Sequence, residues 1–204
     1  MVPVTSQQLQ KLTPNARDEY KTAFAAADAV LANHGINNTP LRLAHFMAQC
    51  MHETGGLTIL RENLNYSVAG LMATWPKRFP TVASAQPFAH RPQAIADFVY
   101  NGRMGNNPPH DGSSFIGRGL LQITGRESYE KYGNILGIDL AGQPELATDG
   151  AWTLKIAAEE WFASNCNKFA DQDEITKVTQ AINGGQIGIA SRRDWLVHTK
   201  NVWN

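Results

Sequence analysis

Two glutamates in this sequence, Glu53 and Glu62, are of a residue type and at a spacing that could support acid–base catalysis. They lie in two polar stretches, HETGG at 52–56 and ENLNYS at 62–67. A glycosidic bond breaks when one carboxylic acid protonates the leaving oxygen while a second carboxylate activates water or attacks the sugar carbon. We therefore interpret the pair as candidates for acid and base at a sugar linkage.

Residues 40–53 are expected to form the helix that carries Glu53. Thr39 before Pro40 is typical of an N-cap followed by proline at the first helical position, and the glycines at 55 and 56 are typical of a helix end. Glu53 would then lie in the last turn, where the helix dipole disfavours a charged carboxylate. A proton retained there is what a general acid needs.

The same helix has an apolar stripe that should face the core and a second stripe that is polar. The polar stripe consists of Arg42, His45, Gln49, His52 and Glu53. On spacing alone, such a stripe is most simply a solvated helix face.

Glu62 is expected in a loop or a short irregular strand. Arg61, Asn63 and Asn65 are potential donors beside it and would favour its charged form, as a general base requires. The simpler interpretation is that Glu62 is one of many surface acids.

A third stretch, residues 117–126, has glycines on both sides of Arg118. Gln122 and Thr124 alternate with apolar residues, so an extended backbone would place both polar side chains on one face. An amide and a hydroxyl there could hold a water molecule or sugar substituents. The alternative is an ordinary half-buried strand after a turn.

The order of these motifs resembles the plant-type (family 19) chitinases and, more closely, their bacteriophage relatives, the chitinase-like endolysins that cut peptidoglycan. The resemblance spans roughly residues 40–200, and further matching pieces lie at 100–106, 137–140, 144–147 and 182–185. It implies a mainly α, lysozyme-like single domain with a small helical lobe and long loops around a substrate groove.

The resemblance also implies roles for individual residues. Glu53 would be the general acid, Glu62 the general base and Thr124 the hydroxyl that positions water. The groove would be lined by Tyr66, Gln122 and Asn183, and we expect His52 beside Glu53 to bind substrate too. The family inverts the anomeric configuration, which requires carboxyl groups roughly 6.5–9.5 Å apart. In plant chitinases the second glutamate lies much further along the chain, so the short spacing here is closer to the phage branch.

The resulting hypothesis is an endolysin that hydrolyses β-1,4 bonds in peptidoglycan during host cell lysis. One alternative is a chitinase acting on poly-N-acetylglucosamine, and another is a non-catalytic wall-binding protein on the same scaffold. A zinc amidase is more remote: His52 and Glu53 begin like the motif H-E-x-x-H, but Gly56 replaces the second histidine, although His45 could share the face. We expect no metal and no cofactor.

The composition fits a lytic enzyme of one domain, residues 1–204, with an inserted lobe at about 68–100 and no separate wall-binding module. The 18 basic and 18 acidic residues balance, which argues against a nucleic-acid partner. No secretory signal and no membrane-spanning apolar run is visible. We therefore expect a monomer made in the host cytoplasm, which reaches the periplasmic wall with the help of a holin, as the resemblance implies.

The apolar spacing predicts mainly helices. They are expected at 15–33, 40–53, 68–75, 92–100, 126–136, 150–164, 172–182 and 187–202, and 101–119 should be loop. Of the two cysteines, Cys50 lies on the apolar side of its helix and is most simply a core thiol. Whether it pairs with Cys166 stays open.

Overall fold

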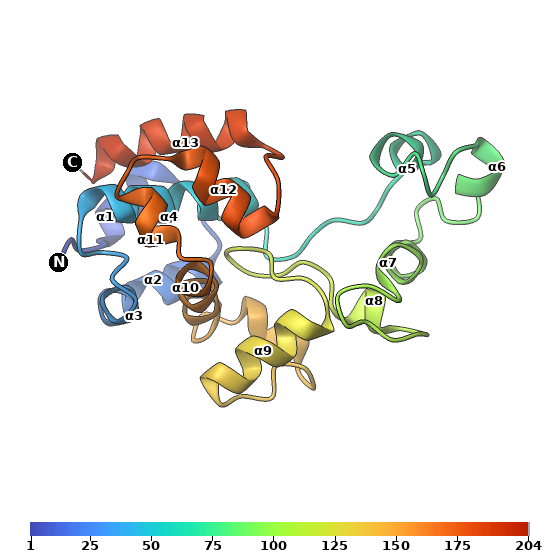
Figure 1. Ribbon diagram of the computed structural model, residues 1–204, viewed down its shortest axis with the longest axis horizontal. Coiled ribbons are helices and arrows are strands. Elements are labelled where there is room, and N and C mark those ends of the chain that lie inside the picture. The colour runs from blue at the N-terminus through green and yellow to red at the C-terminus, as the bar shows by residue number, and fades with distance from the viewer. Residues whose placement is uncertain (204) are drawn as a thin grey trace. The chain divides into compact units, whose positions relative to one another are not determined.

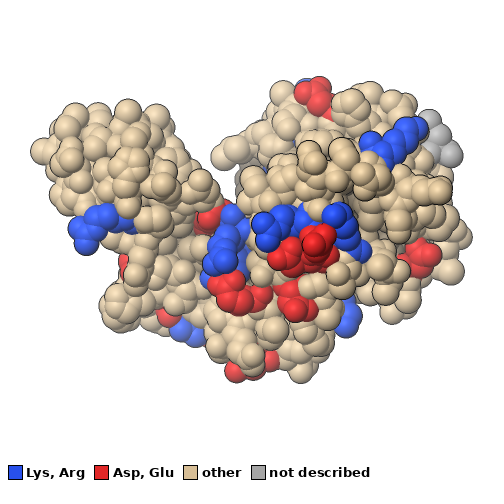
Figure 2. Space-filling model, turned by 180° about the vertical axis from the view of Figure 1, so that it is seen from behind, with Lys and Arg blue, Asp and Glu red and all other residues tan. Residues whose placement is uncertain are grey.

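The computed structural model describes residues 1–203. Helices make up 57% of the described residues, which contain no β-strand, and this confirms the mainly α fold class. None of the helices in the described part is long and apolar enough to cross a membrane. On the face shown in Figure 2, acidic and basic side chains lie next to one another, in keeping with the balanced composition.

The chain divides into two compact units. The first consists of Met1–Leu60, Arg118–Gln122 and Glu145–Asn204, and the second of Arg61–Gly117 and Ile123–Pro144. The lobe expected at about 68–100 lies inside the second unit.

The first unit is built around α4 (Pro40–Glu53), and Figure 1 shows α12 (Ile175–Asn183) and α13 (Ile189–Val202) beside it. The other helices of this unit are α1 (Ser6–Leu12), α2 (Asp18–Ala25), α3 (Ala27–Asn33), α10 (Thr153–Ala163) and α11 (Cys166–Ala170), and it also holds the 3₁₀ helix η1 (Pro144–Thr148) from Glu145 on.

The predicted bounds and cap of α4 are confirmed. The hydroxyl of Thr39 accepts a hydrogen bond from the backbone N–H of Arg42, Pro40 stands in the first turn, and the helix ends at Glu53. All residues from Leu43 to Met51 are buried, so this helix is the centre of the first unit.

The polar stripe of α4 is not a solvated face, contrary to the simplest interpretation. His45 and Gln49 are fully buried, because the stripe faces the C-terminal helices. Arg42 binds both carboxylate oxygens of Asp171 at 2.6 Å, and His45 Nε2 lies 2.8 Å from Asp173. The burial of these polar side chains is tolerated because each has at least one partner across the interface, although Nδ1 of His45 has none among the described residues.

The single helix expected at 15–33 is wrong, since the chain turns at Ala26 and forms α2 and α3. The turn lets Tyr20, Phe24 and Leu31 all reach the core. The sequence patterns also left out α1, although Thr5 and Gln8 form a capping box at its start.

The second unit holds five helices: α5 (Val68–Thr74), α6 (Val82–Ala85), α7 (Pro92–Tyr100), α8 (Asp111–Ser114) and α9 (Arg126–Leu136). The helices expected at 68–75, 92–100 and 126–136 are thereby confirmed, whereas α8 interrupts the loop expected at 101–119. Apolar side chains of this unit form a core of their own, with Leu71, Phe79 and Ile95 at its centre.

The extended backbone expected around Gln122 is wrong. Residues 119–122 form a turn in which Gln122 has φ +52° and its amide donates to the carbonyl of Gly119 at 2.8 Å. Gly119 has φ +78°, and a Cβ there would lie 2.5 Å from the carbonyl oxygen of Ala147. The positive φ favours glycine at position 119, and the close approach to Ala147 leaves no room for a Cβ. Gly119 is therefore required for the turn.

Cys50 and Cys166 are buried, free thiols, which answers the question of pairing. Burial raises the pKa of the Cys166 thiol to about 12 and that of Cys50 well above its usual range. Both are therefore protonated core side chains.

Candidate active site

Glu53 ends α4 with its side chain 16% exposed, and it forms an ion pair with Arg192 of α13. The arginine side chain is only 2% exposed. Its Nη2 donates to Glu53 Oε1, and its Nη1 donates to Gln49 Oε1. A buried guanidinium needs such acceptors, and its planar fork fixes the orientation of both side chains.

Gln49 is held in turn by α12. Its amide donates to the hydroxyl of Thr179 at 3.3 Å, and that hydroxyl donates to the carbonyl of Ile175 at 2.8 Å. The chain of hydrogen bonds from α12 through Gln49 and Arg192 therefore positions Glu53 from the protein interior. Arg192 uses Oε1, and Oε2 accepts no hydrogen bond from the described residues.

His52 packs against the start of α13. Its Nδ1 lies 3.0 Å from the hydroxyl of Ser191, and a Cβ at Gly188, which has φ +75°, would lie 2.3 Å from His52 Nε2. Burial, and then the charge of Arg192, lowers the pKa of His52, so the ring is neutral at pH 7. The predicted substrate-binding residue is thus also part of the contact between α4 and α13.

Glu62 lies in the second unit and is held by neutral donors. Its Oε1 accepts the backbone N–H of Gly117 at 2.6 Å, and its Oε2 accepts the hydroxyl of Tyr100 at 2.8 Å. The expected role of Asn63 and Asn65 as donors is wrong, because among the described residues Glu62 accepts hydrogen bonds from Tyr100 and Gly117 alone. Oδ1 of Asn63 accepts the backbone N–H of Asn65, and Oδ1 of Asn65 lies 2.9 Å from His90 Nδ1. Burial, together with the Glu62 carboxylate, raises the pKa of Tyr100, so its hydroxyl stays a donor.

The remaining predicted residues divide between the units. The first unit contains Glu53, His52, Gln122 and Asn183, and the second contains Glu62, Tyr66 and Thr124. Asn183 is the last residue of α12, and Thr124 is half-buried just before α9. The ring of Tyr66 packs edge-on against Trp75, with centroids 5.1 Å apart.

Arg192 and Tyr100 are the site residues that the sequence patterns missed. Tyr100 stands at the start of the motif at 100–106, but the motif alone does not indicate a role for its hydroxyl. Arg192 gave no local signal, because its partner Glu53 lies 139 positions away. Its position depends on the packing of α13 against α4.

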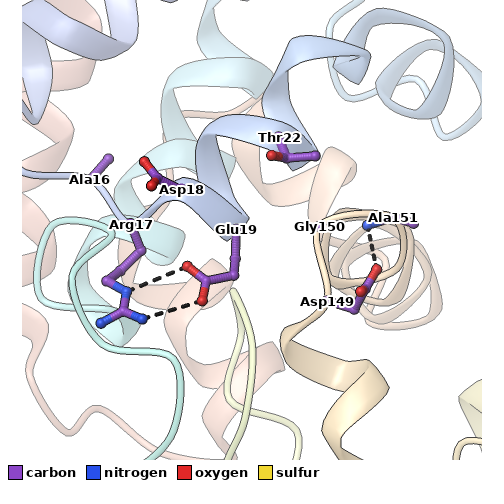
Figure 3. Close-up of a pocket in the computed structure, with 8 residues that line it drawn as sticks. All are labelled: Ala16, Arg17, Asp18, Glu19, Thr22, Asp149, Gly150 and Ala151. Carbon is purple, nitrogen blue, oxygen red and sulfur yellow. Dashed lines mark hydrogen bonds and ion pairs between the residues drawn. The ribbon is translucent and has the colours of Figure 1, made fainter.

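A separate cavity of about 670 Å³ lies in the first unit near the start of α2 (Figure 3). Its charged side chains are satisfied locally: Arg17 pairs with Glu19 at 3.2 Å, and Asp149 accepts the backbone N–H of Ala151 at 2.7 Å.

Comparison with known proteins gives the class of this protein. The family model for class I chitinases, glycoside hydrolase family 19, matches residues 14–183. A family 19 domain-containing protein of Haemophilus influenzae is 36% identical over 93% of this chain and 92% of its own length. Chitinase 2 of rice is 29% identical over 77% of this chain, which spans only 42% of that protein.

Solved structures agree with the fold. A bacterial family 19 chitinase has a TM-score of 0.68 at 21% identity and covers 98% of this chain and 95% of its own. Chitinase C from Streptomyces griseus has a TM-score of 0.67, also at 21% identity, and covers 98% and 92%.

The chain therefore belongs to glycoside hydrolase family 19. It is a chitinase-like enzyme that cleaves glycans.

Proposed function

We propose that this enzyme hydrolyses the β-1,4 bonds of bacterial peptidoglycan strands, with Glu53 as general acid and Glu62 as general base. The observation that carries the assignment of roles is the contrast between their partners. Arg192 holds Oε1 of Glu53 from the interior, and Oε2, which accepts no hydrogen bond from the described residues, is the oxygen that would carry the proton given to the leaving group. Both oxygens of Glu62 accept hydrogen bonds from neutral donors, the backbone N–H of Gly117 and the Tyr100 hydroxyl, which orient it for the role of base.

In this mechanism Glu53 gives its proton to the glycosidic oxygen as the bond from that oxygen to the sugar C1 breaks. Water attacks C1 from the opposite face, and Glu62 accepts the proton that the water loses. The product is a new reducing end with inverted configuration. Thr124 would position the water, and His52, Tyr66, Gln122 and Asn183 would bind the flanking sugars.

The choice of peptidoglycan draws on the order of the motifs around Glu53, Glu62 and Thr124, which resembles that of the chitinase-like endolysins. We extend the proposal to a phage endolysin, made in the host cytoplasm, acting as a monomer and reaching the wall through a holin. The short spacing of the two glutamates supports that branch.

Chitin is the second candidate substrate, because several relatives are named as chitinases. Both polymers are β-1,4-linked amino sugars, so the same carboxylates would serve either.

The decisive experiment is digestion of purified Gram-negative peptidoglycan and of N-acetylglucosamine oligomers in parallel. The reducing ends formed are reduced and identified by mass spectrometry, with the Glu53→Gln variant as control. We expect new reducing ends from peptidoglycan that the variant does not produce. Products from the oligomers alone would make chitin the substrate, and products from neither would contradict both proposals.

A further inference from the structure

A second groove in the first unit lies between α1 and α13, with a volume of about 700 Å³. This is within the range of about 300–1,000 Å³ that is usual for small-molecule sites. We call it the α13 groove. Its polar and aromatic lining consists of Lys11, Ser191, Asp194, Trp195, His198 and Asn201.

One face of α13 supplies most of this lining. Ser191, Asp194, Trp195 and His198 follow one another at steps of three, one and three, so they form a single stripe along the helix. Arg192 points elsewhere, into the interior toward Glu53. The helix therefore presents one face to a candidate catalytic carboxylate and another to the groove.

The chemistry of the α13 groove suits a sugar. Trp195 is half-buried, and its ring packs edge-on against His198 with centroids 6.0 Å apart. Among the described residues, the side chains of Lys11, Asp194 and Asn201 form no hydrogen bond or ion pair, and neither does the indole N–H of Trp195. An aromatic surface with a polar edge, ringed by available donors and acceptors, matches a pyranose.

The charges of the α13 groove and its position near His52 further restrict the kind of ligand that it could bind. Lys11 and Asp194 offset each other, which favours a ligand without strong net charge over a polyanion. Ser191 lines the groove while its hydroxyl lies 3.0 Å from His52, the neighbour of Glu53. A glycan polymer has further sugars beyond the linkage being cut, and these sugars need a surface to bind, which the groove near His52 could provide.

We propose that the α13 groove is an auxiliary binding site for β-1,4-linked N-acetylhexosamine glycan. It holds a stretch of polymer outside the set of residues assigned to hydrolysis. The inference rests on the glycan-cleaving activity of the family, and it does not depend on the choice between peptidoglycan and chitin.

The test uses the full chain in the Glu53→Gln background, so that ligands remain uncut. Tryptophans are replaced by 5-fluorotryptophan, and the Trp195 resonance is assigned by comparison with Trp195→Phe. The two probes are the N-acetylglucosamine tetramer and a disaccharide-peptide from peptidoglycan. We expect a saturable shift of the Trp195 fluorine resonance, and the probe that causes it identifies the source of the glycan.

The binding test also uses variants of exposed groove residues, because substitutions at exposed positions should not prevent the protein from folding. His198→Ala and Asn201→Ala should each weaken binding by about two- to tenfold, the value of one lost hydrogen bond. Val197→Ala is the matched control, since Val197 is 60% exposed on the same helix outside the groove, and it should leave the affinity unchanged. No Trp195 shift with either probe would overturn the proposal, as would equal affinity in all three variants. If the Glu53→Gln protein shows the shift but the parent enzyme does not digest peptidoglycan, the proposed function is contradicted and the groove stays assigned.

Discussion

Glu53 and Glu62 differ in what holds them. Glu53 is paired with a guanidinium that is 2% exposed, within a network that extends to Gln49 and α12. Glu62 accepts hydrogen bonds only from neutral partners among those described above, a backbone N–H and the hydroxyl of Tyr100. A charge that loses its counter-charge in the interior is costly, whereas a neutral donor adapts easily. The same substitution should therefore have different consequences for folding at the two positions.

The largest effect is expected for Glu53→Gln. Loss of the general acid should lower kcat by about 10²–10⁴-fold. The glutamine still offers an oxygen to Arg192 but no counter-charge, so the free energy of unfolding should fall by about 1–3 kcal/mol in a protein that still folds. Reducing-end assays and urea unfolding measure the two quantities. A variant with near wild-type kcat would remove Glu53 from the mechanism.

Glu62→Gln should lower kcat by at least about tenfold, and by up to about 10⁴-fold if the base role is complete. Its stability should change by less than about 1 kcal/mol, because the glutamine oxygen can accept from Gly117 and the Tyr100 hydroxyl can turn to accept from the amide. The same two assays apply. A loss of stability as large as that of Glu53→Gln would refute the contrast between charged and neutral anchoring, and normal activity would place the base elsewhere.

Tyr100→Phe tests the neutral anchor itself. Removing the hydroxyl takes one hydrogen bond from Glu62, so kcat should fall by about two- to tenfold while KM stays unchanged. Because its pKa is raised, the hydroxyl is a donor throughout the usual assay range and the loss should not depend on pH.

The matched control is Tyr20→Phe. The hydroxyl of Tyr20 donates to the backbone carbonyl of Ile59 at 2.7 Å and not to a candidate catalytic group. Its loss should lower stability by about 1 kcal/mol and leave kcat intact. Equal kcat losses in the two variants would mean that Tyr100 acts through general stability alone.

The contrast between Glu53 and Glu62 also shows which structural features can be predicted from the sequence. The helix at 40–53 was predictable because its cap, its proline and its apolar spacing are all local. The burial of its polar stripe was not, since it depends on α13, far along the chain, and Arg192 has no local signature. The alternation of polar and apolar residues around Gln122 is compatible with both a strand and a turn. The positive φ of Gly119 produces the turn.

The smallest expected effect concerns pH and the first unit. The pKa of His52 is lowered from 6.5 by burial, so the unfolded chain binds a proton there more readily than the folded protein. His45, also with a lowered pKa, acts in the same direction. The two neutral histidines contribute fully to the free energy of unfolding above about pH 6.5, the pKa of a histidine in the unfolded chain. This contribution is lost as the pH falls below 6.5, until both histidines are protonated in the folded protein too.

Urea unfolding at pH 7.5 and 5.5 should therefore show lower stability at the acidic pH. His52→Asn keeps a polar group near Ser191 but cannot take up the proton, and we expect it to reduce this difference. His90→Asn is the control from the second unit, where His90 Nδ1 lies 2.9 Å from Asn65, and it should leave the difference as in the parent protein. An identical reduction in both variants would mean that acid sensitivity is not a property of the packing between α4 and α13. A reduction confined to His52→Asn would tie it to the helix pair that orients Glu53.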